Sequence, residues 1–343
     1  AGAEGQTAQE LAKVFHFDAA GESLHTGLAS LMAAWNEADA VELTVANRLF
    51  AEKTYAFQPA FVRLTTDLYA APMQPMDFKG DADGSRQEIN TWVQQHTKER
   101  IRDLLPPGSL DDTTRLVLTN AIYLKADWQT PFAKESTQPA TFHAKGRDVQ
   151  APTMAMAEHL AFAADAAAGV RLLQLPYVGD RLAMLLVLPD AVDGLAAVET
   201  KLDAAALDRW AAAVDAPAAA QRVDLRLPKL VIDPPTSTPL KAALQALGVK
   251  RAFDPEGAQF EAMAPAPPPL YISNAFHKAF IEIDEKGTEA AAATAVVMAE
   301  GAGMPAAPPV SFHVDRPFLF VLRDRVSGAV LFMGRVEDPT AKG

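Results

Sequence analysis

Cysteine is absent from the 343 residues of this sequence. Disulfide bonds, thiolate nucleophiles and thiolate metal ligands are therefore excluded together. Because cysteine usage is what normally separates oxidising from reducing compartments, its absence leaves the compartment open. We favour an extracellular or periplasmic location over a cytoplasmic one.

Positive charge is scarce, with 31 Lys and Arg residues against 43 Asp and Glu residues and a formal net charge of -12 at pH 7. Contact with phosphate groups requires clustered Lys and Arg, and no basic stripe occurs. We therefore expect neither nucleic acid nor a membrane surface as a partner. The chain also lacks an uncharged apolar run of eighteen residues and, at its start, the pattern of a signal peptide, so we expect a soluble chain.

Motifs for catalysis are missing too. The chain has no G-x-S-x-G, no G-x-x-x-x-G-K-S/T, no H-E-x-x-H and no Gly-rich dinucleotide fingerprint. Its seven histidines show no metal-ligand spacing. We predict that the protein is not an enzyme and holds no metal or cofactor. A hydrolase with a Ser-His-Asp triad stays open as an alternative, because the members of such triads occur in any chain order.

What the chain does contain is a mixture of helix and strand patterns. Helical apolar spacing occurs in residues 6–15, 22–39, 58–69, 85–101, 194–214 and 236–249. Strand patterns that end at turn formers occur in residues 41–52, 114–128, 140–144, 170–177, 181–189, 221–232 and 272–285, and residues 317–339 read as a hairpin. We predict an α+β fold with large antiparallel or mixed sheets. No linker or charge run divides the chain, so we expect a single domain, 1–343.

The helix predicted at residues 85–101 has a recognisable start. Ser85 and Glu88 have the spacing of a capping box, in which each side chain satisfies a free backbone N–H of the first turn. Ile89, Trp92 and Val93 then lie on one face. The pattern predicts an amphipathic surface helix.

Within the segment DEKGTEAAAATAVVM, residues 284–298, the part from Gly287 to Ala293 has only small or β-permissive side chains. Such a segment could enter a sheet between two strands without steric conflict, and it runs into a stretch rich in Gly and Pro, residues 299–310, that predicts an exposed loop. A solvent-facing alanine helix is the alternative, because the same residues have high helix propensity. Local propensity does not separate the two.

The segments FHKAFIEIDEKGTEAAAATAVVM (276–298) and SFHVDRPFLFVLRDRVSGAVLFMGRVEDP (311–339) resemble the reactive-loop hinge and the C-terminal signature of the serpins. Upstream, LVLTNAIYLKADWQTPF (116–132), VDLRLPKLVI (223–232) and EINTWV (88–93) also resemble segments of that family, in order. The resemblance implies a large central sheet, two further sheets, surrounding helices and an exposed reactive-centre loop at about residues 286–311.

The resemblance further implies a suicide inhibitor of proteases. A target serine protease would cleave the loop and form an acyl-enzyme, and the hinge would then insert as a new strand of the large sheet. The implied hinge residues are Glu285, Gly287, Thr288, Glu289, Ala290, Ala291, Ala292 and Ala293. In this hinge Gly287 supplies a flexible pivot, and Thr288 is a side chain that can be buried at modest cost.

The position of the scissile bond stays open. The family's usual register, counted forward from the hinge, gives Gly301 followed by Ala302, whereas counting back from Pro317 gives a bond near Ala306. Other candidates are Met298, Glu300 and Met304. No Lys or Arg occurs in residues 287–315, which argues against a trypsin-like target because its pocket requires a cation. We expect an elastase-, subtilisin- or chymotrypsin-like target, with a papain-like cysteine protease as the alternative.

Three further residues match family motifs. Asn120 and His277 match a polar pair beneath the strands that part, where a hydrogen bond could latch the sheet, and Trp128 matches the aromatic where insertion begins, in the region called the breach. From the residues alone the alternatives are a strand cap, a satisfied core histidine and a core tryptophan.

The first residues, GAEGQTAQEL (2–11), resemble the end of the family's second helix and the start of its third. We therefore expect that the first helix, the following strand and most of the second helix are missing from this chain. The helix predicted at residues 22–39 has no Lys or Arg, so a glycosaminoglycan site is not expected. We expect a monomer, and a non-inhibitory serpin, acting as a carrier or chaperone, stays open as an alternative.

Overall fold

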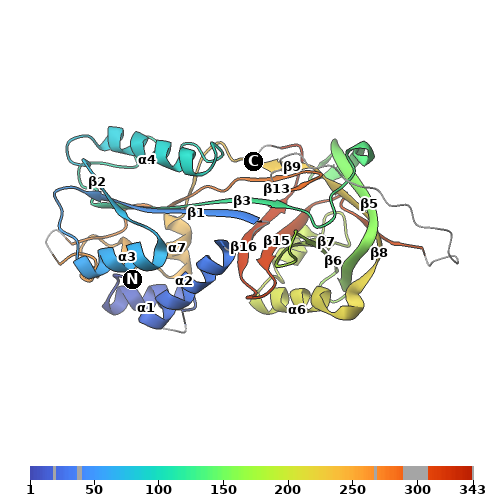
Figure 1. Ribbon diagram of the computed structural model, residues 1–343, viewed down its shortest axis with the longest axis horizontal. Helices are drawn as coiled ribbons and strands as arrows, with labels where there is room; N and C mark the ends of the chain where they lie inside the picture. The colour runs from blue at the N-terminus through green and yellow to red at the C-terminus, as the bar shows by residue number, and fades with distance from the viewer. Residues whose placement is uncertain (18–20, 37–40, 266–268, 289–307, 342–343) are drawn as a thin grey trace. The chain divides into compact units, whose positions relative to one another are not determined.

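The computed structural model describes residues 1–17, 21–36, 41–265, 269–288 and 308–341, and the description excludes the side chains of residues 36, 41–46 and 120–124. The chain forms two compact units (Figure 1). Unit 1 comprises Ala1–Glu37, Leu43–Tyr123 and Pro234–Phe280, and unit 2 comprises Ala38–Glu42, Leu124–Asp233 and Ile281–Gly343. Each unit joins stretches that are remote in sequence, and the single domain 1–343 stays a prediction.

Each predicted helical segment contains a helix. The helices are α1 (Gly5–Val14), α2 (Glu22–Asn36), α3 (Pro59–Tyr69), α4 (Ala82–His96), α5 (Leu195–Glu199), α6 (Ala204–Asp215) and α7 (Lys241–Leu247), with short 3-10 turns η1 (Lys134–Ser136), η2 (Pro217–Ala219) and η3 (Arg251–Phe253). None of the helices in the described part of the chain is long and apolar enough to cross a membrane.

The strands of the described residues form three sheets. They are β1 (Val41–Glu52), β2 (Met73–Met76), β3 (Leu116–Asp127), β4 (Gln138–Ala144), β5 (Arg147–Asp165), β6 (Val170–Pro176), β7 (Leu182–Pro189), β8 (Ala220–Pro228), β9 (Leu230–Ile232), β10 (Thr238–Pro239), β11 (Phe276–His277), β12 (Ile281–Ile283), β13 (Gly287–Thr288), β14 (Val310–His313), β15 (Phe318–Asp324) and β16 (Val330–Val336). One sheet has the order β2-β1-β3-β13-β12-β9, a second has β14-β8-β5-β6-β7-β15-β16 with β4 paired to β5, and β10 pairs with β11. The α+β fold with a large central sheet is thus confirmed.

The strand predicted at residues 272–285 is interrupted. Only Phe276–His277 and Ile281–Ile283 are extended and paired, the first with β10 and the second with β9 and β13. Between them the buried Lys278 donates its ammonium to the Arg102 carbonyl oxygen at 2.8 Å. Residues 272–285 therefore contribute two short strands to two different sheets and do not form one long strand.

Unit 1 packs helices on both sides of its strands. Figure 1 shows α4 on one side of β1, β2 and the start of β3, and α1, α2, α3 and α7 on the other. Ile89 of α4 is fully buried and clusters with Phe50, Phe78 and Val117. The predicted capping box is wrong, because α4 begins at Ala82 and its N-cap is Asp81, whose carboxylate accepts from the Gly84 N–H at 2.9 Å.

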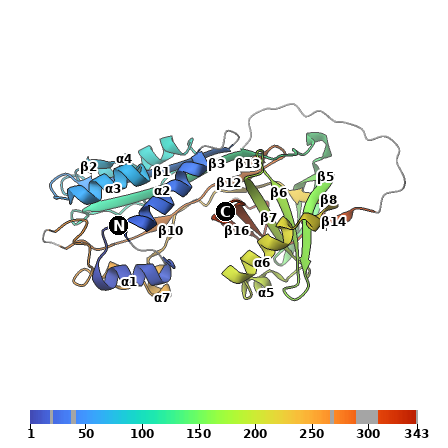
Figure 2. The same cartoon turned by 60° about the horizontal axis from the view of Figure 1, so that its bottom comes forward.

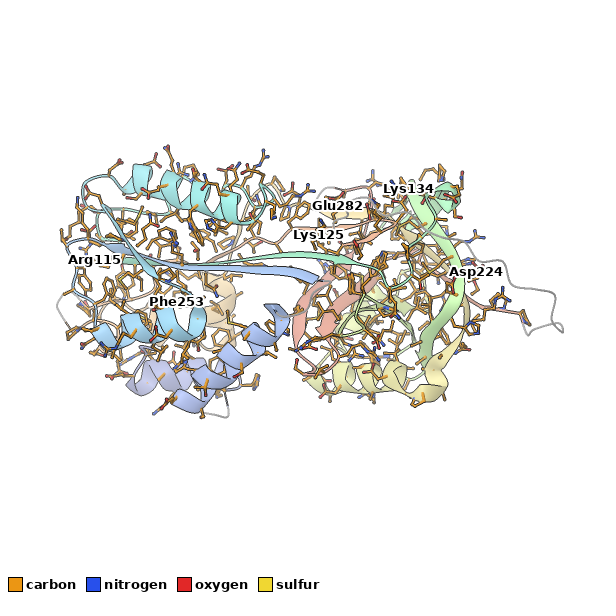
Figure 3. The ribbon with its side chains drawn as sticks, viewed as in Figure 1. Arg115, Lys125, Lys134, Asp224, Phe253 and Glu282 are labelled. Carbon is orange, nitrogen blue, oxygen red and sulfur yellow. The ribbon has the colours of Figure 1, made fainter. Side chains whose placement is uncertain are left out.

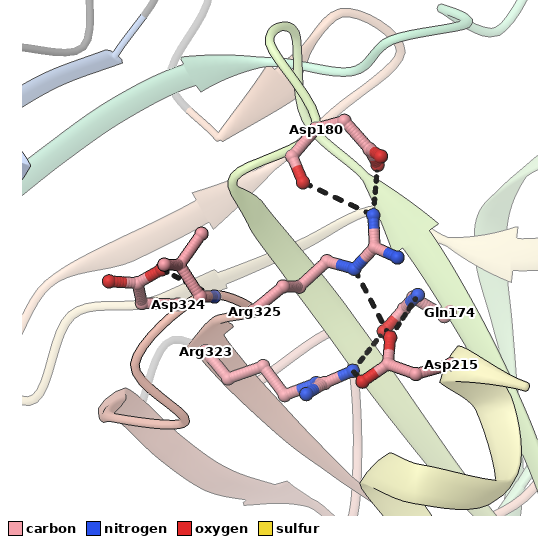
Figure 4. Close-up of polar contacts among 7 residues, drawn as sticks. Gln174, Asp180, Asp215, Arg323, Asp324 and Arg325 are labelled. Carbon is pink, nitrogen blue, oxygen red and sulfur yellow. Dashed lines mark hydrogen bonds and ion pairs between the residues drawn. The ribbon is translucent and has the colours of Figure 1, made fainter.

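Unit 2 is organised around the eight-stranded sheet. α6 lies against β5 and β6 (Figure 2), and its Trp210 is buried among residues of β6, β7 and β15. The predicted hairpin is confirmed as β15 paired antiparallel with β16. The buried Arg323 of β15 donates to the Gln174 amide oxygen at 2.6 Å and to Asp215, at the end of α6, at 2.5 Å (Figure 4). This ion pair ties the helix to the sheet.

Candidate functional site at the hinge segment

Two described residues of the predicted hinge, Gly287 and Thr288, lie in the large sheet. Gly287 and Thr288 form β13, which lies between β3 and β12 and pairs antiparallel with both. Lys125 on β3 and Glu282 on β12, labelled in Figure 3, mark the two flanking strands. A Cβ at position 287 would overlap the Ala126 carbonyl oxygen of β3, so only glycine lets the chain approach this closely.

A tight turn connects β12 to β13. The Asp284 carboxylate accepts from the backbone N–H groups of Lys286 at 2.9 Å and Gly287 at 3.3 Å. The Asp284 N–H in turn donates to the Gly287 carbonyl oxygen at 3.0 Å. This Asp satisfies the turn's free donors and so sets the point at which the hinge doubles back into the sheet.

Thr288 is 2% exposed, and its hydroxyl has a partner from outside the large sheet. The Tyr177 hydroxyl lies 2.7 Å from Thr288 Oγ1. Burial raises the pKa of Tyr177 well above its usual range, although the hydrogen bond to Thr288 opposes this shift, so the phenol stays protonated. Two neutral hydroxyls therefore satisfy each other in a buried position.

Trp128 packs directly on this pair. Its indole is stacked on the Tyr177 ring, with centroids 4.5 Å apart and an interplanar angle of 19°. The indole Nε1–H donates to the Asp284 carbonyl oxygen at 3.0 Å, and the Trp128 backbone N–H donates to the Lys286 carbonyl oxygen at 2.7 Å. The tryptophan thus holds both sides of the turn that precedes Gly287.

Glu285 is a buried carboxylate with two side-chain partners. Lys229, between β8 and β9, donates to its Oε2 at 2.7 Å, and Thr137 donates to its Oε1 at 2.8 Å. Burial by itself would raise the pKa of Glu285, but the bonds from Lys229 and Thr137 outweigh it, so the pKa is lowered. The Glu285 carbonyl oxygen also accepts from the Phe132 N–H at 2.7 Å. The carboxylate is therefore charged, paired and fixed.

Glu285, Gly287, Thr288 and Trp128 are thus brought together, all within unit 2. The predicted hinge residues Glu289, Ala290, Ala291, Ala292 and Ala293 and the scissile-bond candidates Met298, Glu300, Gly301, Ala302 and Met304 lie outside the described residues. At its two ends the predicted loop 286–311 overlaps strands, since β13 begins at Gly287 and β14 at Val310.

The predicted latch between Asn120 and His277 stays a prediction. Asn120 lies in β3, and its side chain is outside the description. His277 is exposed and lies at the end of β11, paired with Thr238 of β10. Both residues belong to unit 1.

Tyr177, Lys229 and Thr137 are the site residues that the sequence did not single out. Each lies at the end of a strand or just beyond one, at the junctions after β6, between β8 and β9, and before β4. No local motif marks them, because their roles depend on contacts more than 50 residues away in the sequence. Glu285 lies among other charged residues, Glu282, Asp284 and Lys286, so the sequence carried no signal that this carboxylate is buried with a distant cation.

The arrangement binds and orients backbone rather than reacting groups. Among the described residues no group of three or more His, Asp or Glu side chains could hold a metal ion. The contacts fix Gly287 and Thr288 between β3 and β12, and the remaining residues of the predicted hinge follow them in the sequence. The geometry is suited to adding a strand.

Comparison with known proteins gives the family. The family model described as "Serpin (serine protease inhibitor)" matches residues 1–339. The leukocyte elastase inhibitor of Homo sapiens is 36% identical over 344 residues, which cover 98% of this chain and 88% of that protein. Serpin B3 of Homo sapiens is 36% identical over 358 residues, covering 98% and 89%. The crystal structure of uncleaved ovalbumin superposes with a TM-score of 0.88 at 30% identity, covering 98% of this chain and 88% of that one. The chain belongs to the serpin family.

Proposed function

We propose that this protein inhibits a protease by trapping it as a covalent acyl complex. The target cleaves the segment between Thr288 and β14, and the hinge then inserts as a full strand between β3 and β12. The observation that carries the proposal is that Gly287 and Thr288 already pair with both strands in the intact chain. Glu285, one turn earlier, anchors the hinge to Lys229.

The register of β13 supports insertion of the segment that follows. Thr288 pairs with Ala126, so an antiparallel strand continued in register would place residue 289 opposite 125 and residue 298 opposite 116, the first residue of β3. Ten further residues would therefore use the whole of β3. At about 0.5 to 1.5 kcal/mol net for each backbone hydrogen bond, ten residues would stabilise the inserted chain by on the order of ten kcal/mol.

The same register bears on the bond that is cleaved. A segment that fills β3 ends at Met298, so cleavage after Glu300, Gly301 or Ala302 leaves enough chain to insert completely and still reach the protease. In the covalent step the serine hydroxyl of the target attacks the scissile carbonyl, and the amide bond breaks. The new amine departs with the C-terminal fragment, while the acyl ester joins the inhibitor to the protease. Insertion then competes with hydrolysis of that ester.

Subtilisin, elastase, chymotrypsin and trypsin provide the test. Each is mixed with the protein, the products are run on denaturing gels, and the mass of the released C-terminal peptide is measured. We expect a complex that survives SDS with one of the first three proteases and none with trypsin, because no Lys or Arg occurs in residues 287–315. The leukocyte elastase inhibitor, named for such a target, supports this preference.

The measured peptide mass fixes the scissile bond. Cleavage by every protease without any stable complex would overturn the trapping mechanism and favour the non-inhibitory alternative, a carrier or chaperone with the same fold.

A further inference from the structure

The hydroxyl of Thr288 is held by a side chain that belongs to neither neighbouring strand. Tyr177 follows β6, and its hydroxyl lies 2.7 Å from Thr288 Oγ1. Thr288 is 2% exposed and Tyr177 is fully buried. If Thr288 left the sheet, the Tyr177 hydroxyl would lose this hydrogen bond while it stayed buried. A buried hydroxyl without a partner costs free energy, so the loss would be unfavourable.

The Tyr177 ring is also fixed, so it cannot follow Thr288. Its backbone N–H donates to the Leu182 carbonyl oxygen at 3.0 Å, and its face is stacked on Trp128 at 4.5 Å. Tyr177 and Trp128 further form an antiparallel β-bridge. The Tyr177 hydroxyl is therefore a hydrogen-bond partner whose position is fixed by these contacts.

We infer that Tyr177 is a positioning residue that holds the hinge partly inserted in the resting chain through its hydrogen bond to Thr288. The backbone pairs of β13 are only two residues long, and a strand this short is easily released. The hydrogen bond between Tyr177 and Thr288 adds a side-chain contact to these pairs. Thr288 is the first side chain of the hinge to enter the sheet, so this hydrogen bond can persist while the following residues insert. The role of this contact during insertion rests on the proposed function, whereas its role in the uncleaved chain does not.

Hydrogen exchange on the full chain, without any protease, tests the positioning role. The amide of Thr288 reports opening of β13. We expect Tyr177→Phe to raise its exchange rate about tenfold, because the buried Thr288 hydroxyl then lacks its partner. Thr288→Val should raise it too, and the double variant should exchange no faster than the faster of the single variants, because both changes remove the same bond. Unchanged exchange in Tyr177→Phe, or effects that multiply in the double variant, would overturn the inference.

Thr137→Val is the matched control. Its hydroxyl donates to Glu285, three residues before Thr288, so this variant also removes one hinge hydrogen bond but not the one at Tyr177. In combination with Tyr177→Phe its effect should multiply, as for independent contacts. If Thr137→Val and Tyr177→Phe were as strongly coupled as Thr288→Val and Tyr177→Phe, Tyr177 would have only a general packing role and the inference would be wrong.

A second measurement addresses trapping. With the protease that forms a complex, we expect Tyr177→Phe to need at least about three times more inhibitor per protease than the native chain, because insertion starts from a released hinge. An unchanged requirement would show that Tyr177 does not position the hinge for insertion. If the native chain itself forms no complex, the proposed function fails, and the exchange data still decide the role of Tyr177.

Discussion

Thr288 occupies a position where a side chain must be small and neutral. It is 2% exposed, and its hydroxyl is already paired with Tyr177. Thr288→Arg would place a cation in this buried position beside the neutral Tyr177 hydroxyl, and burying an unpaired charge is strongly unfavourable. We expect this variant to be cleaved as a substrate, with the yield of SDS-stable complex reduced at least about tenfold on a gel.

Thr66→Arg is the control for this prediction. Thr66 is exposed on α3, so the added charge stays in water and the complex yield should be unchanged. Normal complex formation by Thr288→Arg would contradict the insertion of this residue.

The Lys229–Glu285 pair makes a second residue-level prediction. Lys229→Met leaves Glu285 buried without its cation, and we expect the free energy of the first unfolding transition to fall by about 2 kcal/mol at pH 7. Urea denaturation measures this difference. Lys134→Met, which removes an exposed lysine at the first position of η1, should change this free energy by less than about 0.5 kcal/mol.

The pH dependence of that difference follows from the lowered pKa of Glu285. A depressed carboxyl pKa contributes stability that is present above the ordinary value of 4.5 and is lost as pH falls through the folded-state pKa. The gap between the native chain and Lys229→Met should therefore narrow below about pH 4. A gap that is constant from pH 7 to pH 3.5 would show that the ion pair is not its cause.

At the level of single residues, Glu285, Gly287, Thr288 and Trp128 could be named as candidates from the sequence because they lie in contiguous motifs, and the structure places them close together. Tyr177 and Lys229 could not be named in this way. A tyrosine after a buried strand and a lysine between two short strands are common features, and only the folded chain brings them to the hinge. Long-range pairing of this kind has no local pattern.

Among the elements, the sequence pattern did not reveal the longest strand of the described residues, β5, nor the short strands β2, β10 and β14. β5 spans Arg147–Asp165 and pairs with β4, β6 and β8, yet eight of its residues are Ala or Met, which favour helices. Its partners on both sides override that propensity. The start of α4 was misplaced for a related reason, since Asp81 and Ser85 are both good caps and the fold uses the first.

The contact between α6 and β15 carries an element-level prediction. Asp215→Asn removes the negative charge that pairs with the 5% exposed Arg323 and with Arg325, so the buried Arg323 guanidinium keeps neutral acceptors but no counter-ion at this position (Figure 4). We expect the free energy of unfolding to fall by about 2 to 3 kcal/mol at pH 7, measured by urea denaturation. Asp208→Asn, an exposed change on the same helix, should have little effect. Equal losses in the two variants would mean that the pair does not hold the helix.

For the molecule as a whole, the α+β class and the family could be predicted because they rest on many independent segments. Hydrophobic runs bounded by turn formers gave most strands, and the C-terminal signature, residues 311–339, gave the family. The existence of β13 could not be predicted in the same way. A two-residue strand of Gly and Thr has no periodicity, and it exists because β3 and β12 present unpaired backbone on both sides of it.

The intact chain, if the proposed function holds, is not in its most stable arrangement. Cleavage within residues 289–307 would free the segment after Thr288 to pair along β3 as far as Leu116, adding on the order of ten kcal/mol. For a chain of this size we expect the thermal midpoint to rise by more than about 10 °C, measured by calorimetry on the cleaved and intact proteins. Cleaved Thr288→Arg should show no such rise, because its hinge cannot enter the sheet. A cleaved native chain that melts at the same temperature as the intact one would mean that the hinge stops at Thr288 and that the energy for trapping a protease does not come from strand insertion.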